Sequence, residues 1–121
     1  MVTRTVQDLA TRTMKLLGLL EAQEEASAED FGDISHAYEN RYADLVFREI
    51  AWWPQAEIPL EAFEFMARIM ADEVASAFGR STPMEVDENG RTVSMGMRGL
   101  RGLKRISQRA ATGLPAPANY F

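Results

Sequence analysis

Three carboxylates lie at helical spacing near the middle of the chain: Glu61, Glu64 and Asp72. Carboxylates grouped on one face can act in acid–base catalysis or bind a divalent cation. The chain contains no phosphate-binding loop, no nucleophile elbow and no HExxH or other paired metal-ligand spacing, and its one histidine, His36, falls on a polar helix face. We therefore favour a solvated polar stripe, and we expect neither catalysis nor a metal or other cofactor.

A second group of charged residues follows near the C-terminus. Steps of three, four and four residues place Arg98, Arg101, Arg105 and Arg109 along one side of a helix. Together with the neighbouring lysine they form a group that we call the basic row: Arg98, Arg101, Lys104, Arg105 and Arg109. Such a row can contact DNA phosphates or an acidic protein surface, or it can be a solvated face. The chain is acidic overall and lacks both interleaved aromatics and a helix-turn-helix pattern, which argues against DNA. All three interpretations stay open.

The last nine residues, 113–121, read GLPAPANYF. Pro115 and Pro117 favour an extended, polyproline-like chain that has no means of folding alone. Two aromatic side chains follow, and such apolar surface is rarely left without a receptor. We therefore predict an extended docking tail that binds a partner or a neighbouring copy through these residues: Leu114, Pro115, Pro117, Tyr120 and Phe121.

The elements that must position these groups are helices. Apolar residues recur every three or four positions over residues 6–19, 28–50 and 59–78, which predicts three long helices. Residues 80–92 contain an Asn-Gly turn pair and are predicted to form a loop or a small hairpin. From residue 93 onward the apolar spacing again favours a helix. The sequence therefore predicts an all-α fold, a small bundle of three long helices plus a fourth C-terminal helix.

Helix boundaries are marked by capping residues. Thr5 and Asp8 form a capping box for the first helix, and Ser27 caps the second. Pro59 suits the first position of the third helix, and Gly79 suits its left-handed end.

Three glycines complicate the fourth helix, because each costs about 1 kcal/mol relative to alanine in a helix. Gly96, Gly99 and Gly102 recur every three residues along one side. They would let another backbone approach closely, or let the segment reorganise during assembly.

The third helix is predicted to be the centre of the fold because it is apolar on nearly all sides. Its main face comprises Leu60, Phe63, Met66, Ala67, Met70, Val74 and Phe78. The buried stripe of the second helix comprises Phe31, Ile34, Tyr38, Tyr42, Leu45 and Val46, with Glu49 at its edge. Trp52 and Trp53 are predicted to fill the corner between these helices, with a role in an interface as the alternative. Some neighbours of so apolar a helix can belong to another copy, so core or interface positions are expected at Trp52, Trp53, Phe63, Met66 and Met70.

Composition bounds the remaining possibilities. A length of 121 residues predicts one domain, here 1–112, followed by the tail 113–121. The absence of cysteine excludes disulfides, and no continuous apolar stretch suggests a signal peptide or a membrane span, so we expect a soluble protein. Charge is unevenly distributed: residues 1–90 hold 18 acidic and 7 basic side chains, whereas residues 91–121 hold six basic and none acidic. Such a molecule can lay its basic part on an acidic partner or on a neighbouring copy.

The pattern as a whole resembles the head-to-tail adaptor proteins of tailed bacteriophages, in particular the tail accessory, or packaged-DNA-stabilising, branch of short-tailed phages. The resemblance rests on TVQDLATRTMKLLGLL, on EEASAEDFGDISHAYENRYADL, on a long helix ending in tryptophans, and on the final PAPANYF. It covers about residues 5–79, and its motifs are caps and spacings without a catalytic signature. The three glycines of the fourth helix depart from the usual pattern.

The resemblance implies a small helical bundle that forms a ring, usually of twelve copies, beneath the portal protein at one capsid vertex. Such a ring extends the DNA channel, helps retain packaged double-stranded DNA without sequence specificity, and offers a surface to tail or nozzle proteins. The implied location is the neck of the virion, after synthesis in the host cytoplasm.

Two other classes of function remain as alternatives. One is a small helical DNA-binding or packaging protein that uses the basic row over residues 98–109. The other is an enzyme that uses the carboxylates of the third helix, for example a glycosidase acting on cell walls.

Overall fold

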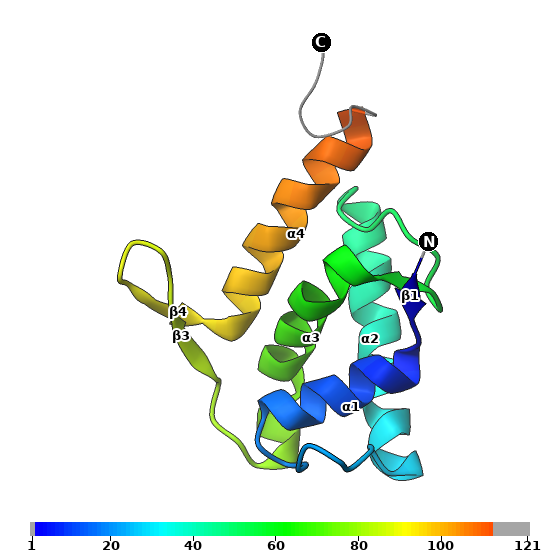
Figure 1. Ribbon diagram of the computed structural model, residues 1–121, viewed down its shortest axis with the longest axis vertical. Helices are drawn as coiled ribbons and strands as arrows, with labels where there is room; N and C mark the ends of the chain where they lie inside the picture. The colour runs from blue at the N-terminus through cyan, green and yellow to red at the C-terminus, as the bar shows by residue number, and fades with distance from the viewer. Residues whose placement is uncertain (1, 113–121) are drawn as a thin grey trace.

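The computed structural model describes residues 2–112, with side chains up to residue 109, and the fold is mainly α-helical, as predicted (Figure 1). The helices are α1 (Val6–Leu16), α2 (Ala28–Phe47), α3 (Leu60–Val74) and α4 (Met95–Thr112), with a single 3-10 turn, η1 (Ser76–Phe78), after α3. No helix within residues 2–112 is long and apolar enough to cross a membrane.

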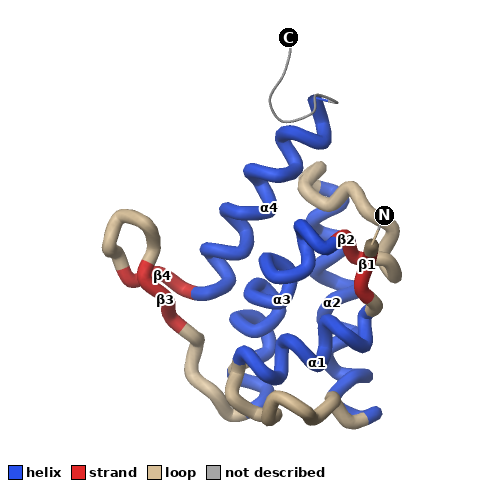
Figure 2. Tube along the Cα trace, viewed as in Figure 1, coloured by secondary structure: helices blue, strands red, loops and turns tan. Residues whose placement is uncertain are grey.

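Two short antiparallel strand pairs accompany the helices. β1 (Thr3–Arg4) pairs with β2 (Ile58–Pro59), and β3 (Met84–Val86) pairs with β4 (Thr92–Ser94). Figure 2 shows the two pairs on opposite sides of the helices. The second pair is the predicted hairpin, and Gly90 adopts a positive φ of 78° in its turn. The first pair was not predicted, because two-residue strands carry no periodicity.

Helix α3 is the centre of the fold, since α1, α2 and α4 all pack against it (Figure 1). Its buried side chains surround most of the helix: Ala62, Met66, Ala67, Ile69, Met70, Ala71 and Val74. Met66 and Met70 are completely buried, as predicted, whereas Phe63 is only half-buried. Burial on several sides of one helix explains why its sequence reads as apolar nearly all round.

The predicted third helix was too long. Regular α-helix begins at Leu60, one residue after Pro59, which lies in β2 and caps the helix in extended conformation. The helix ends at Val74 and the chain continues through η1 to Gly79, whose φ of 73° confirms the left-handed end. Leu60 was wrongly assigned to the buried face, because it is 44% exposed at the first turn.

Helix α2 also ends earlier than predicted, at Phe47 instead of residue 50. Glu49 has a positive φ of 59°, and the N–H of Ile50 donates to the carbonyl of Leu45 at 2.8 Å, which closes the helix end. The predicted burial of Val46 and Glu49 is wrong, since Val46 is 45% exposed and Glu49 is exposed.

The predicted start of each of the first two helices is confirmed. Thr5 Oγ1 accepts from the N–H of Asp8, and the Asp8 carboxylate accepts from the N–H of Thr5, each at 3.1 Å. Ser27 Oγ accepts from the N–H of Asp30 at 3.2 Å. These bonds satisfy donors that a helix leaves free at its first turn. Helix α1 ends at Leu16, three residues before the predicted end.

Candidate functional site

The outer face of α4 is the candidate site, because it carries the basic row. The opposite face of α4 packs on α3, and the three glycines make this approach possible. A Cβ at Gly99 would overlap the backbone oxygen of Phe65, and a Cβ at Gly102 would overlap the Phe65 ring. The predicted close approach of another backbone is therefore confirmed, and that backbone belongs to α3 of the same chain.

The start of α4 is fixed by two side chains outside the helix. The N–H of Gly96 donates to Asp72 Oδ2 of α3 at 3.0 Å, and the N–H of Met97 donates to Ser94 Oγ at 3.2 Å. A Cβ at Gly96 would overlap the Asp72 carboxylate. Asp72 therefore orients α4 and is not part of a merely solvated stripe.

The β3–β4 hairpin supplies carboxylates to the first half of the basic row. Arg98 lies 3.6 Å from Glu85, which also pairs with Arg68 of α3 at 3.2 Å. Arg101 lies 3.4 Å from Asp87, whose side chain is only 2% exposed. These pairs join the hairpin, α3 and α4. Arg98 and Arg101 of the basic row therefore already stabilise the fold.

Asp87 organises the turn of the hairpin. Its Oδ1 accepts the N–H groups of Asn89 and Arg91, each at 2.9 Å. The hydrogen bond from Arg91 lowers the pKa of the Asp87 carboxyl, and those from Asn89 and Arg101 act in the same direction against the effect of burial. Sequence reasoning missed Glu85 and Asp87 as partners of the row. Their position beside the Asn-Gly turn was the available signal.

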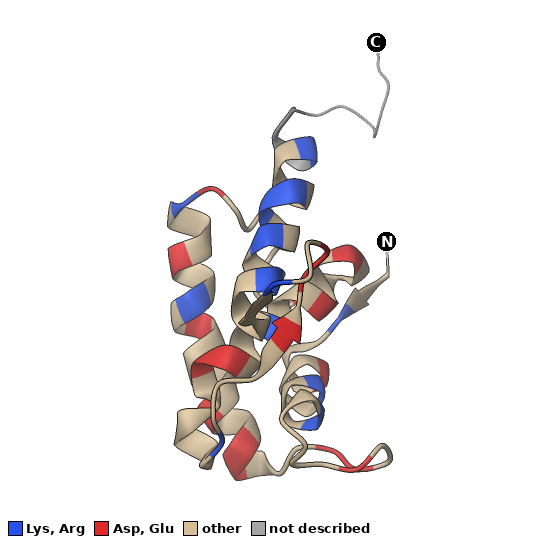
Figure 3. Ribbon diagram, turned by 90° about the vertical axis from the view of Figure 1, so that its left-hand side faces the viewer, with Lys and Arg blue, Asp and Glu red and all other residues tan. Residues whose placement is uncertain are grey.

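The second half of the basic row is turned to solvent. Lys104, Arg105 and Arg109 are exposed, while Arg98 is half-buried and Arg101 has 48% of its side chain exposed. Figure 3 shows the basic residues following one another along α4. The structure thus confirms that the five residues share the outer side of this helix, and divides them into a part bound to the hairpin and an exposed part.

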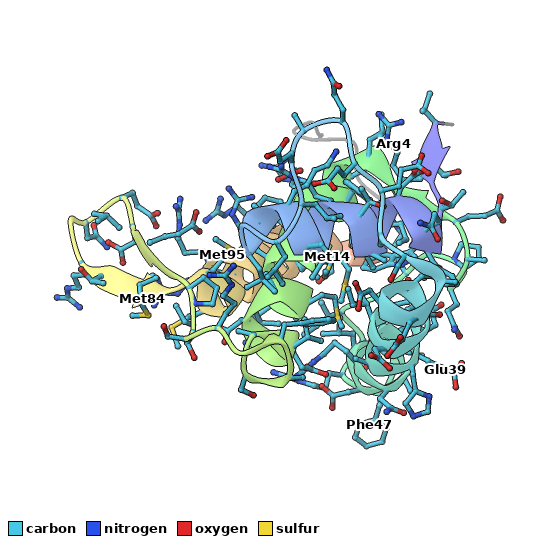
Figure 4. All side chains as sticks on the ribbon, turned by 90° about the horizontal axis from the view of Figure 1, so that it is seen from below. Arg4, Met14, Glu39, Phe47, Met84 and Met95 are labelled. Atoms are coloured by element: carbon cyan, nitrogen blue, oxygen red, sulfur yellow. The ribbon has the colours of Figure 1, made fainter. Side chains whose placement is uncertain are left out.

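A groove of about 270 Å³ separates α4 from α2, with α3 as its floor. Its apolar lining comprises Leu45, Ile69, Met97 and Leu100, and an Arg41–Glu73 hydrogen bond of 2.7 Å lies at its edge. At the last position of α2, Phe47 is 86% exposed and points away from the body of the molecule (Figure 4). These positions offer apolar surface on either side of α2.

The tryptophan pair combines a core position with a partly open one. Trp53 is 3% exposed and its Nε1 donates to the Tyr38 hydroxyl at 3.1 Å, while Trp52 is 38% exposed and contacts Trp53 edge to face with ring centres 4.9 Å apart. Burial raises the pKa of Tyr38 to about 12, and its hydroxyl donates to the carbonyl of Gln55 at 2.8 Å. The predicted filling of the corner is confirmed for Trp53, whereas the interface alternative for the partly exposed Trp52 stays a prediction.

The other polar candidates bind structural partners or face solvent. Glu64 pairs with Arg12 of α1 at 2.7 Å and with Arg68 at 3.4 Å, whereas Glu61 and His36 are exposed. Across the part of the chain that the structure describes, no group of three or more His, Cys, Asp or Glu could hold a metal ion. The tail residues, Leu114, Pro115, Pro117, Tyr120 and Phe121, lie outside the described residues.

Comparison with known protein families, with curated proteins and with solved structures found no match to this chain.

Proposed function

We propose that the chain is a structural virion protein, a head-to-tail adaptor that forms a ring beneath the portal of a tailed bacteriophage. The ring, of about twelve copies in the family it resembles, would extend the DNA channel, help retain packaged DNA and present a surface to tail or nozzle proteins. In this role residues 1–112 form the helical adaptor domain, and residues 113–121 form the extended tail that binds the portal or a neighbouring subunit. The role requires no catalysis and no cofactor.

The observation that supports the proposal most strongly is the arrangement of α4. This helix packs on α3 through glycines, carries charge on its outer face and projects beyond the rest of the helices (Figure 1). The fold therefore presents surface for repeated contacts on several sides: the outer face of α4, the groove between α2 and α4, Trp52 and Phe47. The described polar groups serve capping and ion pairing between elements, which suits a structural component.

The direct test mixes the purified chain with the portal protein of the same phage and images the product by cryo-electron microscopy. We expect an added ring of density on one end of the portal, with the chain itself monomeric or weakly associated beforehand. A portal that gains no density at any ratio of the two proteins would contradict the adaptor role. A stable closed ring formed by the chain alone would contradict the expectation that the portal directs assembly.

A second candidate function is DNA binding by the basic row, and the exposure of Lys104 and Arg105 favours it. In that case the isolated chain binds duplex DNA with an affinity that falls steeply with salt. Fluorescence anisotropy with a labelled duplex at several salt concentrations measures this. An adaptor that contacts DNA only inside an assembled channel shows no such binding as an isolated chain.

A further inference from the structure

The exposed half of α4 and the longest acidic stretch of the chain lie apart in the molecule. Lys104 and Arg105 are exposed at the start of the second half of α4, whereas the chain between residues 16 and 40 holds seven carboxylates and no lysine or arginine. Lys15, at the edge of this stretch, donates to the carbonyl of Ala22 at 2.8 Å. Figure 1 shows the connection from α1 to α2 and the first turn of α2 at the opposite end of the molecule from the last turns of α4. We call this opposite end the acidic end. Its exposed carboxylates are Glu21, Glu24, Glu25, Glu29 and Asp33.

Charges at the two ends cannot neutralise each other within one copy. At physiological salt, interactions between exposed charges are largely screened beyond about 8 Å. Lys104 lies nine residues from the start of α4, which is about 14 Å at about 1.5 Å per residue, and Figure 1 shows the acidic end beyond that start. The two surfaces can therefore pair closely only across two molecules.

We propose that the exposed half of α4 binds the acidic end of a second copy of this chain, so that copies associate head to tail. The inference rests on the proposed assembly of several copies into one ring, and it names the two surfaces that meet. Arg98 and Arg101 contribute less, because their charges are already paired with Glu85 and Asp87 of the hairpin.

The charge distribution also limits the symmetry of the contact. A two-fold contact centred on either surface would place like charges together, and like charges repel, whereas an antiparallel two-fold pair would use both surfaces at once and stop at a dimer instead of a ring. A head-to-tail contact joins opposite charges and leaves one of each surface free for the next copy. Repetition of such a contact gives a ring when the rotation closes and a filament when it does not.

DNA is the competing partner for the same basic face. The second copy is favoured because the chain supplies the complementary surface itself, and because its net charge of −5 opposes approach to a polyanion. Self-association requires the acidic end of the second copy, whereas DNA binding by the basic face does not. Variants at that end therefore separate them.

The test is a charge exchange between the two surfaces, carried out on the full chain without portal. One variant carries Lys104→Glu and Arg105→Glu, and the other carries Glu25→Lys and Glu29→Lys. None of these four side chains has a hydrogen bond or ion pair within the described part of the structure, so both variants should fold. Analytical ultracentrifugation at high protein concentration and low ionic strength measures association. We expect each variant alone to associate at least about tenfold more weakly than the unchanged chain.

Mixing the two variants is the decisive step. Each new acidic surface then meets a new basic one, and each unchanged surface meets its original complement, so we expect association to return. The matched control is Arg80→Glu with Arg91→Glu, an equal change of net charge at two exposed residues off the basic row, which should leave association unchanged. Circular dichroism verifies that all variants are folded.

Several outcomes would overturn the inference. An unchanged chain that stays monomeric at high concentration and low salt, or a mixture that fails to regain association, rules out this contact. Loss of DNA binding in the Lys104/Arg105 variant with unaltered association assigns the face to DNA. The adaptor role is decided separately by assembly on the portal: a ring that forms there despite both reversals removes this contact and leaves the proposed function standing.

Discussion

At the scale of single residues, the glycines of α4 and the buried carboxylate of Asp87 determine how α4 and the hairpin are held together. Glycine at 99 is required by the Phe65 backbone, whereas Gly32 of α2 has open space around its Cα. The two positions are both helical and differ only in what a side chain would meet. They form a matched pair for measuring the closeness of α3 and α4.

We predict that Gly99→Ala lowers the free energy of unfolding by about 1–3 kcal/mol, because the added methyl group must displace a backbone. Gly32→Ala should instead raise it by about 0.5–1 kcal/mol through better helix propensity. Urea denaturation of both variants measures the two changes. Equal effects of the same sign would show that α4 does not approach α3 this closely.

Met66→Ala and Phe63→Ala should lower the stability of the fold by different amounts, although the sequence places both residues on the same apolar face. Met66 is completely buried, so Met66→Ala should destabilise the fold by about 2–5 kcal/mol. Phe63 is half-buried beside the α1–α2 connection, so Phe63→Ala should cost less. Thermal unfolding of both variants measures the order, and a larger loss at Phe63 would contradict the burial described here.

Asp87 predicts a pH dependence for the hairpin. Its pKa is lowered in the folded protein, so the ionised form stabilises the hairpin at pH above the usual aspartate range. This stability is lost as the pH falls through the lowered pKa and the carboxyl takes up a proton. The protection factors of the amides in residues 84–94, which compare each exchange rate with its intrinsic rate at the same pH, should therefore fall at acid pH, and Asp87→Asn should lower them at all pH values. A hairpin protected equally at acid and neutral pH would exclude this role.

At the scale of elements, the sequence is informative where a pattern repeats and uninformative where a contact is unique. Helices α1 and α2 follow from apolar spacing and from the caps at Thr5 and Ser27, because these signals are local. The same spacing continues past Val74, although the chain there turns into η1, so periodicity overestimates the length of α3.

Tertiary partners explain what could not be predicted of the candidate site. The basic row was identified from its spacing, yet the binding of Arg98 and Arg101 to the hairpin depends on Glu85 and Asp87, which reach α4 only once the hairpin folds back. The glycines indicated a close approach, but no sequence pattern identifies Phe65 as the residue approached. The pairing of β1 with β2 joins residues more than fifty positions apart and has no local signal.

At the scale of the whole molecule, the proposed adaptor role makes a prediction about the tail. Deleting residues 118–121 should leave the melting temperature of the isolated chain unchanged and sharply reduce its incorporation into particles. Two aromatic side chains buried on a receptor contribute about 2–3 kcal/mol each, and repetition around a ring multiplies the effect through avidity. Particle composition after assembly measures this loss.

The control for the deletion exchanges Ala116 and Ala118 for serine, which keeps both aromatic residues. It should assemble like the unchanged chain. If the truncated chain also assembles normally, the tail is not a docking element and the proposed role of Tyr120 and Phe121 is wrong.

The glycine contact between α3 and α4 has a mechanical consequence. The glycines and the Arg68–Glu85 pair hold the first half of α4 and the hairpin against α3, so this half of the helix follows α3 as one body. The part of α4 from Gly99 to Thr112 is about 20 Å long, so a change of about 10° in the angle between α3 and α4 would move its tip by about 3 Å. A small change at the contact is thereby enlarged at the far end of the helix.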